Sequence, residues 1–381
     1  MPLIHEPLTR ETLTRETHET TPGPARRALR AAAITACLPY LTLKALWIAG
    51  SHVGIPDGSV LLEHRGRMAV GNGVSVLMDA CVIVLALLLT RPWGLRVKPW
   101  LLAVPMWLAT GLLAPVMTGY PLQLLVRVLR GNGVRPPANG TGTGTATFLH
   151  EWVFAVVYTG FIVQGLALGA LFALYARDRW GHLWRGRVGE LTDDTGVGVP
   201  PVSRAVALAV AVLSLLPAVT HTVWATGSAA GMTPSLAAGR SADQYVVEAV
   251  FAAFTVPAAA GALMLAFGLG RSLPLRLPLA LAWLGSGATA CWGGWLWLSS
   301  GVFGAGPGDR PTLLMNLTYA VQMITGLAVV ALGTRFLAER SQLLAERSRL
   351  PAERPPLPNG THASAGPGGH RSHDRHRTGT P

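Results

Sequence analysis

Residues 44–51, Lys-Ala-Leu-Trp-Ile-Ala-Gly-Ser, and residues 221–228, His-Thr-Val-Trp-Ala-Thr-Gly-Ser, decide the fold, because one motif occurs twice at an offset of 177. Three further matches follow in the same order, at offsets of 180, 176 and 161. They are Arg91 and Arg96 with Arg271 and Arg276, Trp107-Leu-x-Thr-Gly111 with Trp283-Leu-x-Ser-Gly287, and Tyr158-x6-Gly165 with Tyr319-x6-Gly326. This order predicts an internal duplication.

The composition is that of a membrane protein. Hydrophobic residues make up 50% and charged residues 13% of the chain, whereas a soluble domain carries about a quarter charged residues. Eight long apolar runs occupy residues 31–50, 68–90, 100–119, 151–176, 204–226, 245–269, 278–300 and 312–334. Each is close to the roughly 20 residues that a helix needs to cross the hydrocarbon layer. The runs lack the period-two alternation of membrane strands. We therefore expect an all-α, polytopic transmembrane helical bundle with eight spans.

The positive charges predict the orientation of the spans. Of the 31 Lys and Arg residues, 23 lie in segments on the amino-terminal side of the membrane and 7 on the other, with Lys44 inside the first span. By the positive-inside rule, both termini are expected in the cytoplasm. The net charge of +12 thus reports topology and contact with the lipid bilayer, and nucleic-acid binding is not expected. Because four spans separate the copies, the repeats are expected to be parallel, related by a pseudo-twofold axis along the membrane normal.

The runs divide the chain into six segments. Only two of the 31 cations are Lys, and this bias suggests a high-GC bacterial genome and a cell-membrane location. The expected segments are a disordered cytoplasmic arm (1–30), a first four-helix repeat (31–176), a cytoplasmic linker (177–203), a second four-helix repeat (204–334), an amphipathic cytoplasmic helix (335–350) and a disordered tail (351–381). An interfacial helix is expected over Pro121–Arg130, at the start of the outer loop 121–149.

Ionisable residues inside a span are costly, so each one marks a candidate site. Asp79 lies eleven residues into the second span, about 16 Å deep at 1.5 Å per residue. Lys44, near the outer end of the first span, is within reach as a partner, although outward snorkelling of Lys44 and a protonated Asp79 bonded to Ser75 or backbone is the alternative. His221 occupies the Lys44 position of the second copy, whereas the position that matches Asp79 is expected to be apolar.

Two buried amides complete the candidate polar lining. Gln164 and Gln322 lie at mid-membrane depth on the fourth and eighth spans, where hydrogen bonding between helices is the alternative to lining a cavity. No phosphate-binding loop, Gly-x-Ser-x-Gly turn, His-Glu-x-x-His helix or Cys-x-x-Cys pair occurs in the sequence. We therefore expect no catalytic residues, no metal and no cofactor.

The [Lys/His]-x-x-Trp-x-x-Gly element, carried here by Lys44, Trp47, Gly50 and their counterparts in residues 221–227, resembles polytopic membrane proteins of high-GC bacteria. The resemblance covers two short pieces of helix, and Lys44 departs from its His-first pattern. It implies no activity.

Three functions remain open. The first is a non-enzymatic membrane protein that binds or transports a small or lipid-like ligand at the repeat interface, lined by Asp79, Lys44, His221, Gln164 and Gln322. The second is a membrane-embedded enzyme acting on a lipid or quinone through His150, Glu151 and the loop 121–149. The third is an accessory subunit that forms a homodimer, or binds a membrane-protein partner, through Leu337–Leu350.

Overall fold

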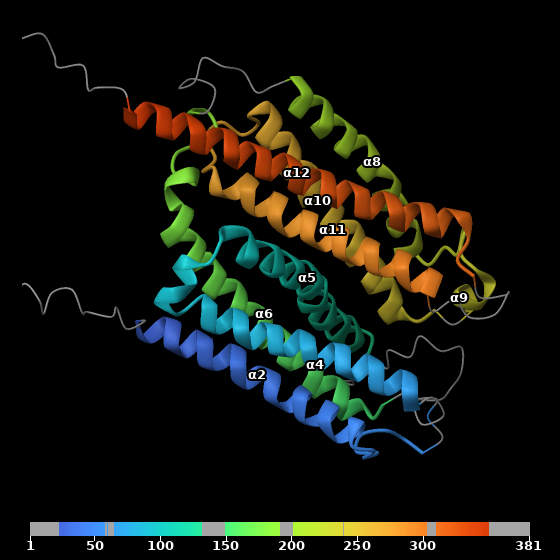
Figure 1. Ribbon diagram of the computed structural model, residues 1–381. Coiled ribbons are helices and arrows are strands. Elements are labelled where there is room, and N and C mark those ends of the chain that lie inside the picture. Colours follow the sequence, from blue (N-terminus) through green and yellow to red (C-terminus); the bar gives the residue numbers. More distant parts are fainter. Residues whose placement is uncertain are drawn as a thin grey trace, which may run out of the picture. The chain divides into compact units, whose positions relative to one another are not determined.

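The fold is known from a computed structural model, which describes residues 23–57, 59, 65–131, 149–190, 201–238, 240–302 and 310–349 (Figure 1). The expected arm up to residue 22, residues 132–148 of the outer loop and the tail from residue 350 lie outside the described residues. Contacts divide the chain into two units, residues 1–339 and 340–381. The helix bundle belongs to the first unit.

The described residues are helical and contain no strand, which confirms the all-α prediction. The long helices are α2 (Pro24–Ile48), α4 (Arg65–Leu88), α5 (Pro99–Leu129), α6 (Glu151–Trp180), α8 (Pro201–Ala225), α10 (Ala242–Phe267), α11 (Arg276–Val302) and α12 (Leu313–Arg349). The short helices are η1 (Pro92–Arg96), η2 (Gly181–Trp184) and α9 (Pro234–Ala238). Each predicted apolar run falls on one long helix.

Seven of these helices are long and apolar enough to cross a membrane, within the part of the chain that is described. The exception is α11, which lies against α5 and α10. Glycine replaces apolar bulk along α11 because neighbouring backbones approach it closely. A Cβ added at Gly285 would stand 2.2 Å from the backbone N of Ala258 on α10, and one added at Gly326 of α12 would stand 2.5 Å from the backbone N of Ala290 on α11.

The long helices form two groups of four. In the first, α2 contacts α4 and α6, and α5 contacts α6; in the second, α10 contacts α8 and α11 (Figure 1). The groups meet where α5 contacts α11 and α10. At the crossing of α5 and α11, Gly111 faces Gly287 so closely that a Cβ on Gly111 would stand 2.3 Å from the Gly287 carbonyl oxygen. Beside this contact, Trp107 Nε1 donates a hydrogen bond to Ser286 Oγ at 3.0 Å.

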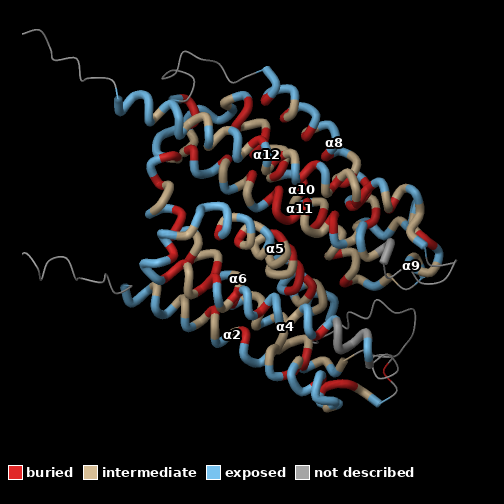
Figure 2. Tube along the Cα trace, in the orientation of Figure 1, coloured by how far each residue is buried: buried red, intermediate tan, exposed pale blue. Residues whose placement is uncertain are grey.

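Buried residues occur along the helices of both groups (Figure 2). Each group has its largest apolar cluster at the end of the bundle where α2 and α8 begin. These clusters are centred on Leu85, Leu102, Met106 and Leu171 in the first group, and on Val210, Ala262, Leu265 and Val329 in the second. Smaller clusters surround Trp47 and Trp224 toward the opposite end. The buried polar side chains described below lie between the two levels.

The duplicated motif adopts the same local structure in both places. The indole Nε1 of Trp47 donates to the carbonyl oxygen of Val53 at 2.7 Å, and that of Trp224 donates to the carbonyl oxygen of Ala230 at 3.0 Å. In each case the acceptor lies six residues after the tryptophan. The indole therefore binds the loop back onto the end of its helix.

The glycine and serine of the motif shape that loop. Gly50 and Gly227 have φ angles of 89° and 98°, in the left-handed region that favours glycine. Ser51 Oγ and Ser228 Oγ each accept a hydrogen bond from the backbone N–H two residues later, at 3.3 Å in both copies. Sequence identity at these positions thus corresponds to identical hydrogen bonding.

Two predicted boundaries were wrong, and a third lies inside a continuous helix. Residues 24–30 belong to α2 and not to the arm, because Pro24 starts the helix. Pro121–Leu129 continues α5 instead of forming a separate interfacial helix. Residues 335–349 belong to the same helix as the span before them, so the predicted segment boundary at residue 334 falls within α12. An ion pair between Arg335 Nε and Glu339 Oε1, at 2.8 Å and one turn apart, is compatible with an unbroken helix there.

Candidate functional site

The five residues of the predicted polar lining occupy two separate places. Lys44, Asp79 and Gln164 lie on α2, α4 and α6 of the first group, and His221 and Gln322 lie on α8 and α12 of the second. The members of each set interact with one another. Among the described residues no contact joins the two sets, so they form two sites.

In the first site, Lys44 is held by an amide and two aromatic rings. Its Nζ donates to Asn72 Oδ1 at 2.7 Å and lies 4.8 Å from the centre of the Tyr40 ring and 5.1 Å from that of the Trp47 ring. Cation–π attraction of this kind offsets part of the hydration free energy that an ammonium group loses on burial. Lys44 interacts electrostatically with Asp79, but its direct hydrogen bond goes to Asn72.

Asp79 is the least satisfied group of this site. Only 4% of the residue is exposed, and its carboxyl group interacts with the Gln164 side chain. Among the residues that the structure describes, Oδ2 of Asp79 has no hydrogen-bond partner, and neither does Nδ2 of Asn72. Ser75 is no partner of Asp79, because its hydroxyl donates to the Gly71 carbonyl oxygen at 2.9 Å. A buried carboxylate oxygen without a partner is costly, and protonation or a bound donor would remove that cost.

The polar residues of α4 face α2 in successive steps. Asn72, Ser75 and Asp79 are spaced by three and four residues, which places them on one side of a helix. Their neighbours on α2 follow the reverse order, as expected for antiparallel helices. The pairs, here called the outer, middle and inner rungs, are Lys44 with Asn72, Tyr40 with Ser75, and Cys37 with Asp79.

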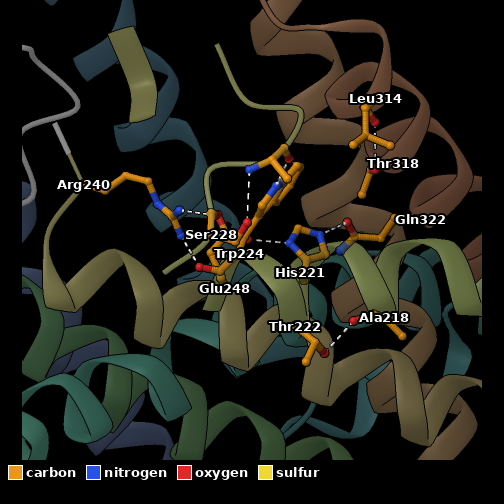
Figure 3. A network of polar contacts seen from close by, with 11 residues as sticks. Ala218, His221, Thr222, Trp224, Ser228, Arg240, Glu248, Leu314, Thr318 and Gln322 are labelled. Atoms are coloured by element: carbon orange, nitrogen blue, oxygen red, sulfur yellow. Dashed lines mark hydrogen bonds and ion pairs between the residues drawn. The ribbon is translucent and has the colours of Figure 1, made fainter. Parts of the chain in front are cut away.

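In the second site, the imidazole of His221 joins three helices (Figure 3). Its Nδ1 lies 2.5 Å from Glu248 Oε2 on α10, and its Nε2 lies 3.0 Å from Gln322 Oε1 on α12. The His221 side chain is 1% exposed and that of Glu248 is 16% exposed. Both ring nitrogens are therefore bound in a place that bulk water scarcely reaches.

Aromatic rings enclose this imidazole. Trp224 packs edge-on against His221 at 5.4 Å between ring centres, and Phe251 lies at the same distance on the α10 side. Tyr319 of α12 packs on Trp224 at 6.5 Å and interacts electrostatically with Glu248. The polar network thus lies in apolar surroundings, which strengthen its hydrogen bonds.

Arg240 binds the end of α8 beside this site (Figure 3). Its guanidinium group donates to the carbonyl oxygens of Trp224 and, at 2.7 Å, Ser228. It also lies 4.6 Å from the centre of the Tyr245 ring. A cation at a helix carboxyl end satisfies carbonyl groups that lack intrahelical partners.

The two sites use corresponding positions. His221 is 177 residues after Lys44, and Glu248 is 176 residues after Asn72, the offset that also relates Trp283 to Trp107. The outer rung is therefore Lys–Asn in one half and His–Glu in the other. Asp79 corresponds at the same offset to residue 255, a buried threonine, so the expectation of an apolar residue there was wrong.

Glu248 is the site residue that was missed from the sequence. Its place early in the sixth span suggests an outward, water-facing carboxylate. The signal that identifies it is the offset of 176, which puts it opposite Asn72 and thus against His221. Matching the polar residues of the two copies by type does not find Glu248, because its counterpart in the first copy, Asn72, is an amide and not a carboxylate.

The residues of the enzyme hypothesis lie at the carboxyl end of α5 and the amino end of α6. The backbone N–H of His150 donates to the Gly54 carbonyl oxygen at 2.8 Å, and Glu151 interacts electrostatically with Arg127. Arg127 forms an ion pair with Asp243 of α10, with Nε 2.9 Å from Oδ1. Most of the loop 121–149 lies outside the described residues, so convergence on one pocket stays a prediction. The partner contact through Leu337–Leu350 also stays a prediction.

A cavity of about 250 Å³ opens where α5 and α6 meet α11. Apart from Thr110, its lining is apolar. The lining residues are Met106, Ala109, Thr110, Leu113, Ala114 and Met117 of α5, Gly165, Leu166, Leu168, Gly169 and Ala170 of α6, and Leu284 of α11. The cavity is thus at the junction of the two helix groups, whereas the polar sites lie within the groups.

Within the described ranges, no three His, Cys, Asp or Glu side chains gather closely enough to hold a metal ion. Comparison of the chain with protein families, with curated proteins and with solved structures found no match.

Proposed function

We propose that this chain is a non-enzymatic, eight-span protein of the cell membrane, built from two parallel four-helix repeats, that binds or carries a lipid-like ligand in the cavity between them. Seven apolar helices and the excess of positive charge on one side of the predicted spans support the membrane location. The eighth crossing is assigned to α11, which lies against α5 and α10.

Contacts at the middle of the bundle support the duplication. The two glycines that correspond at an offset of 176, Gly111 and Gly287, touch each other. A residue meets its own counterpart only on the twofold axis that relates two copies. The proposed parallel repeats would have their axis at this contact, between α5 and α11.

The orientation has a direct test. Reporter enzymes fused after residue 349 and before residue 23 should both be active on the cytoplasmic side. A fusion within the loop 132–148 should report the opposite side. Termini on opposite faces would refute the even number of spans.

The cavity is the observation that carries the ligand class. Its walls offer methyl, methylene and thioether groups and a single hydroxyl, so a ligand gains dispersion contacts there but almost no hydrogen bonds. Its position in the middle of α5 and α6 would place it at hydrocarbon depth, where acyl and isoprenoid chains are the abundant apolar molecules. A volume of about 250 Å³ suits a segment of such a chain rather than a whole lipid.

Gly169 allows the cavity to be filled without disturbing the helices. A Cβ at Gly169 would meet no atom within 4 Å, so leucine at this position extends into open space. Gly333 of α12 is equally open and does not line the cavity, which makes Gly333→Leu the matched control.

The experiment uses a phospholipid with a photoactivatable acyl chain, added to membranes that contain the full-length chain. Wild-type protein and Gly333→Leu should be labelled on α5 and α6, and mass spectrometry of peptides locates the label. Labelling of Gly169→Leu should be lower by at least about tenfold. The added leucine takes the space of several methylene groups of the ligand, whose burial would otherwise stabilise binding. Equal labelling of both variants would refute the proposed cavity.

A further inference from the structure

We infer that His221, Glu248 and Gln322 form a proton-binding site, whose proton links α8, α10 and α12. The inference is independent of the lipid-like ligand and of the cavity. It needs only the contacts of the second site and their burial. Failure of the labelling experiment above would leave it untouched.

The first argument is the count of hydrogen-bond donors. Both ring nitrogens of His221 face oxygen atoms, the carboxylate oxygen of Glu248 at 2.5 Å and the amide oxygen of Gln322 at 3.0 Å. An imidazolium has two N–H donors and satisfies both oxygens, whereas neutral imidazole has one. Loss of the proton therefore sets a nitrogen lone pair against the Gln322 oxygen. Either the amide turns over to donate its NH₂ group, or the contact between α8 and α12 breaks.

The second argument is charge. With the proton bound, the imidazolium and the carboxylate of Glu248 cancel, and the network is neutral. Without it, one negative charge stays among Trp224, Phe251 and Tyr319, which is expensive in apolar surroundings.

The ionisable groups beside the network on neighbouring elements are Tyr319 and Arg240, and the contacts described include no ion pair between Arg240 and Glu248. From α12, the phenol of Tyr319 is the ionisable group near Glu248. From the loop after α8, the guanidinium of Arg240 binds the carbonyl oxygens of Trp224 and Ser228. From α11, Trp292 reaches Phe251 with an uncharged ring.

The third argument is size and access. The three side chains touch directly, so between them there is room for a proton and for nothing larger. Glu248 is 16% exposed and His221 is 1% exposed, which makes the carboxylate the point of entry. Glu248 lies six residues from the first residue of α10, or about 9 Å along the helix, close to its outer end.

The first half provides the contrast. Its outer rung joins the Lys44 ammonium to the amide of Asn72, which cannot accept or release a proton. One half therefore has a rung with a single titratable group, and the other has a pair of groups that share a proton. The two halves therefore differ at the outer rung, both in residue type and in charge.

The test uses Trp224 as an internal probe, because an imidazolium quenches the fluorescence of a tryptophan in contact with it. Purified full-length protein in lipid nanodiscs is titrated between about pH 5 and pH 9, which brackets the range of histidine titration. Wild-type fluorescence should rise with pH, and Trp224→Phe and His221→Gln should each remove this component. Glu248→Gln should also alter this component, because an amide cannot neutralise the imidazolium.

Two variants control for unrelated groups. His182→Gln and Glu339→Gln change an exposed histidine and a glutamate that pairs with Arg335, and both should titrate as the wild type does. Trp224→Phe keeps all three site residues, so the test survives if the other variants misfold. A wild-type signal that Trp224→Phe does not reduce, or that Glu248→Gln does not alter, would overturn the proton site.

The link between helices has its own measurement. Hydrogen exchange of α12 peptides that contain Gln322, corrected for the intrinsic effect of pH, should increase above the fluorescence midpoint in the wild type. In His221→Gln it should not change across the same range. Equal exchange in the wild type above and below the midpoint would show that the proton does not join α8 to α12.

Discussion

Replacing Gly111 with alanine tests the contact on which the arrangement of the two halves depends. The added Cβ would stand 2.3 Å from the carbonyl oxygen and 2.5 Å from the carbonyl carbon of Gly287. Both are backbone atoms in the middle of α11 and cannot rotate away. Ordinary contact begins at 3.4 Å, so α5 and α11 must separate by about 1 Å.

The reciprocal change is far milder, although the two glycines correspond. A Cβ on Gly287 would stand 3.0 Å from Gly111 Cα and 3.3 Å from the Trp107 carbonyl oxygen, which shifts of a few tenths of an ångström relieve. Overpacking costs about 1–3 kcal/mol, and alanine returns about 0.5–1 kcal/mol through its better helix propensity. We expect Gly111→Ala to lose about 1–2 kcal/mol and Gly287→Ala to stay within about 0.5 kcal/mol of the wild type.

The assay is reversible unfolding of the purified protein in mixed micelles, with Gly333→Ala as the control. Gly333 has no atom within 4 Å of its added Cβ, so this variant reports the helix propensity alone. Interaction between Trp107 and Ser286 provides a second reading, since separation of α5 from α11 breaks that hydrogen bond. Equal stabilities for Gly111→Ala and Gly287→Ala would refute the close approach of the two helices.

The remaining predictions concern single hydrogen bonds and charges. Trp47→Phe and Trp224→Phe should each cost about 1 kcal/mol in the same unfolding assay, because each removes one indole hydrogen bond to a loop carbonyl; a large difference between them would contradict the shared geometry. Asp79→Leu should be less stable than Asp79→Asn by about 1–2 kcal/mol, since only asparagine keeps a polar partner for Gln164, and equal midpoints would count against that interaction. Arg127→Ala should cost about 2 kcal/mol, because it leaves the buried carboxylate that binds Arg127 without its cation; a thermal midpoint like that of the wild type would show that the ion pair is dispensable.

The apolar runs predict where the helices lie, because an apolar segment in lipid must satisfy its own backbone hydrogen bonds and does so as a helix. They fail at the helix ends. Arg335 and Glu339 end the hydrophobic run of α12, yet they pair with each other and are compatible with a helix that continues to Arg349. Pro121 reads as a boundary, yet α5 runs through it. Hydropathy indicates whether a segment is surrounded by lipid or by water. Where a helix ends depends instead on local hydrogen bonding.

The polar sites were predictable as residues but not as partners. Burial cost identifies Asp79 and His221, because an ionisable group within a span needs a reason to be there. Packing decides which helices face each other, and the sequence of one span does not identify the helices that pack against it. The pairing of His221 with Glu248 instead of with Lys44 or Asp79 follows from α8 lying on α10, which periodicity within one helix does not contain.

The exchange of apolar bulk for glycine in α11 has a consequence for how the chain is made. Taken singly, this segment gains less than its seven companions by leaving the translocation channel for lipid. Its backbone is shielded only once α10 lies beside it and α12 has been synthesised. We expect α11 to enter the bilayer together with α12, so that a protein truncated after residue 302 would hold this segment in the membrane less well than the full-length chain.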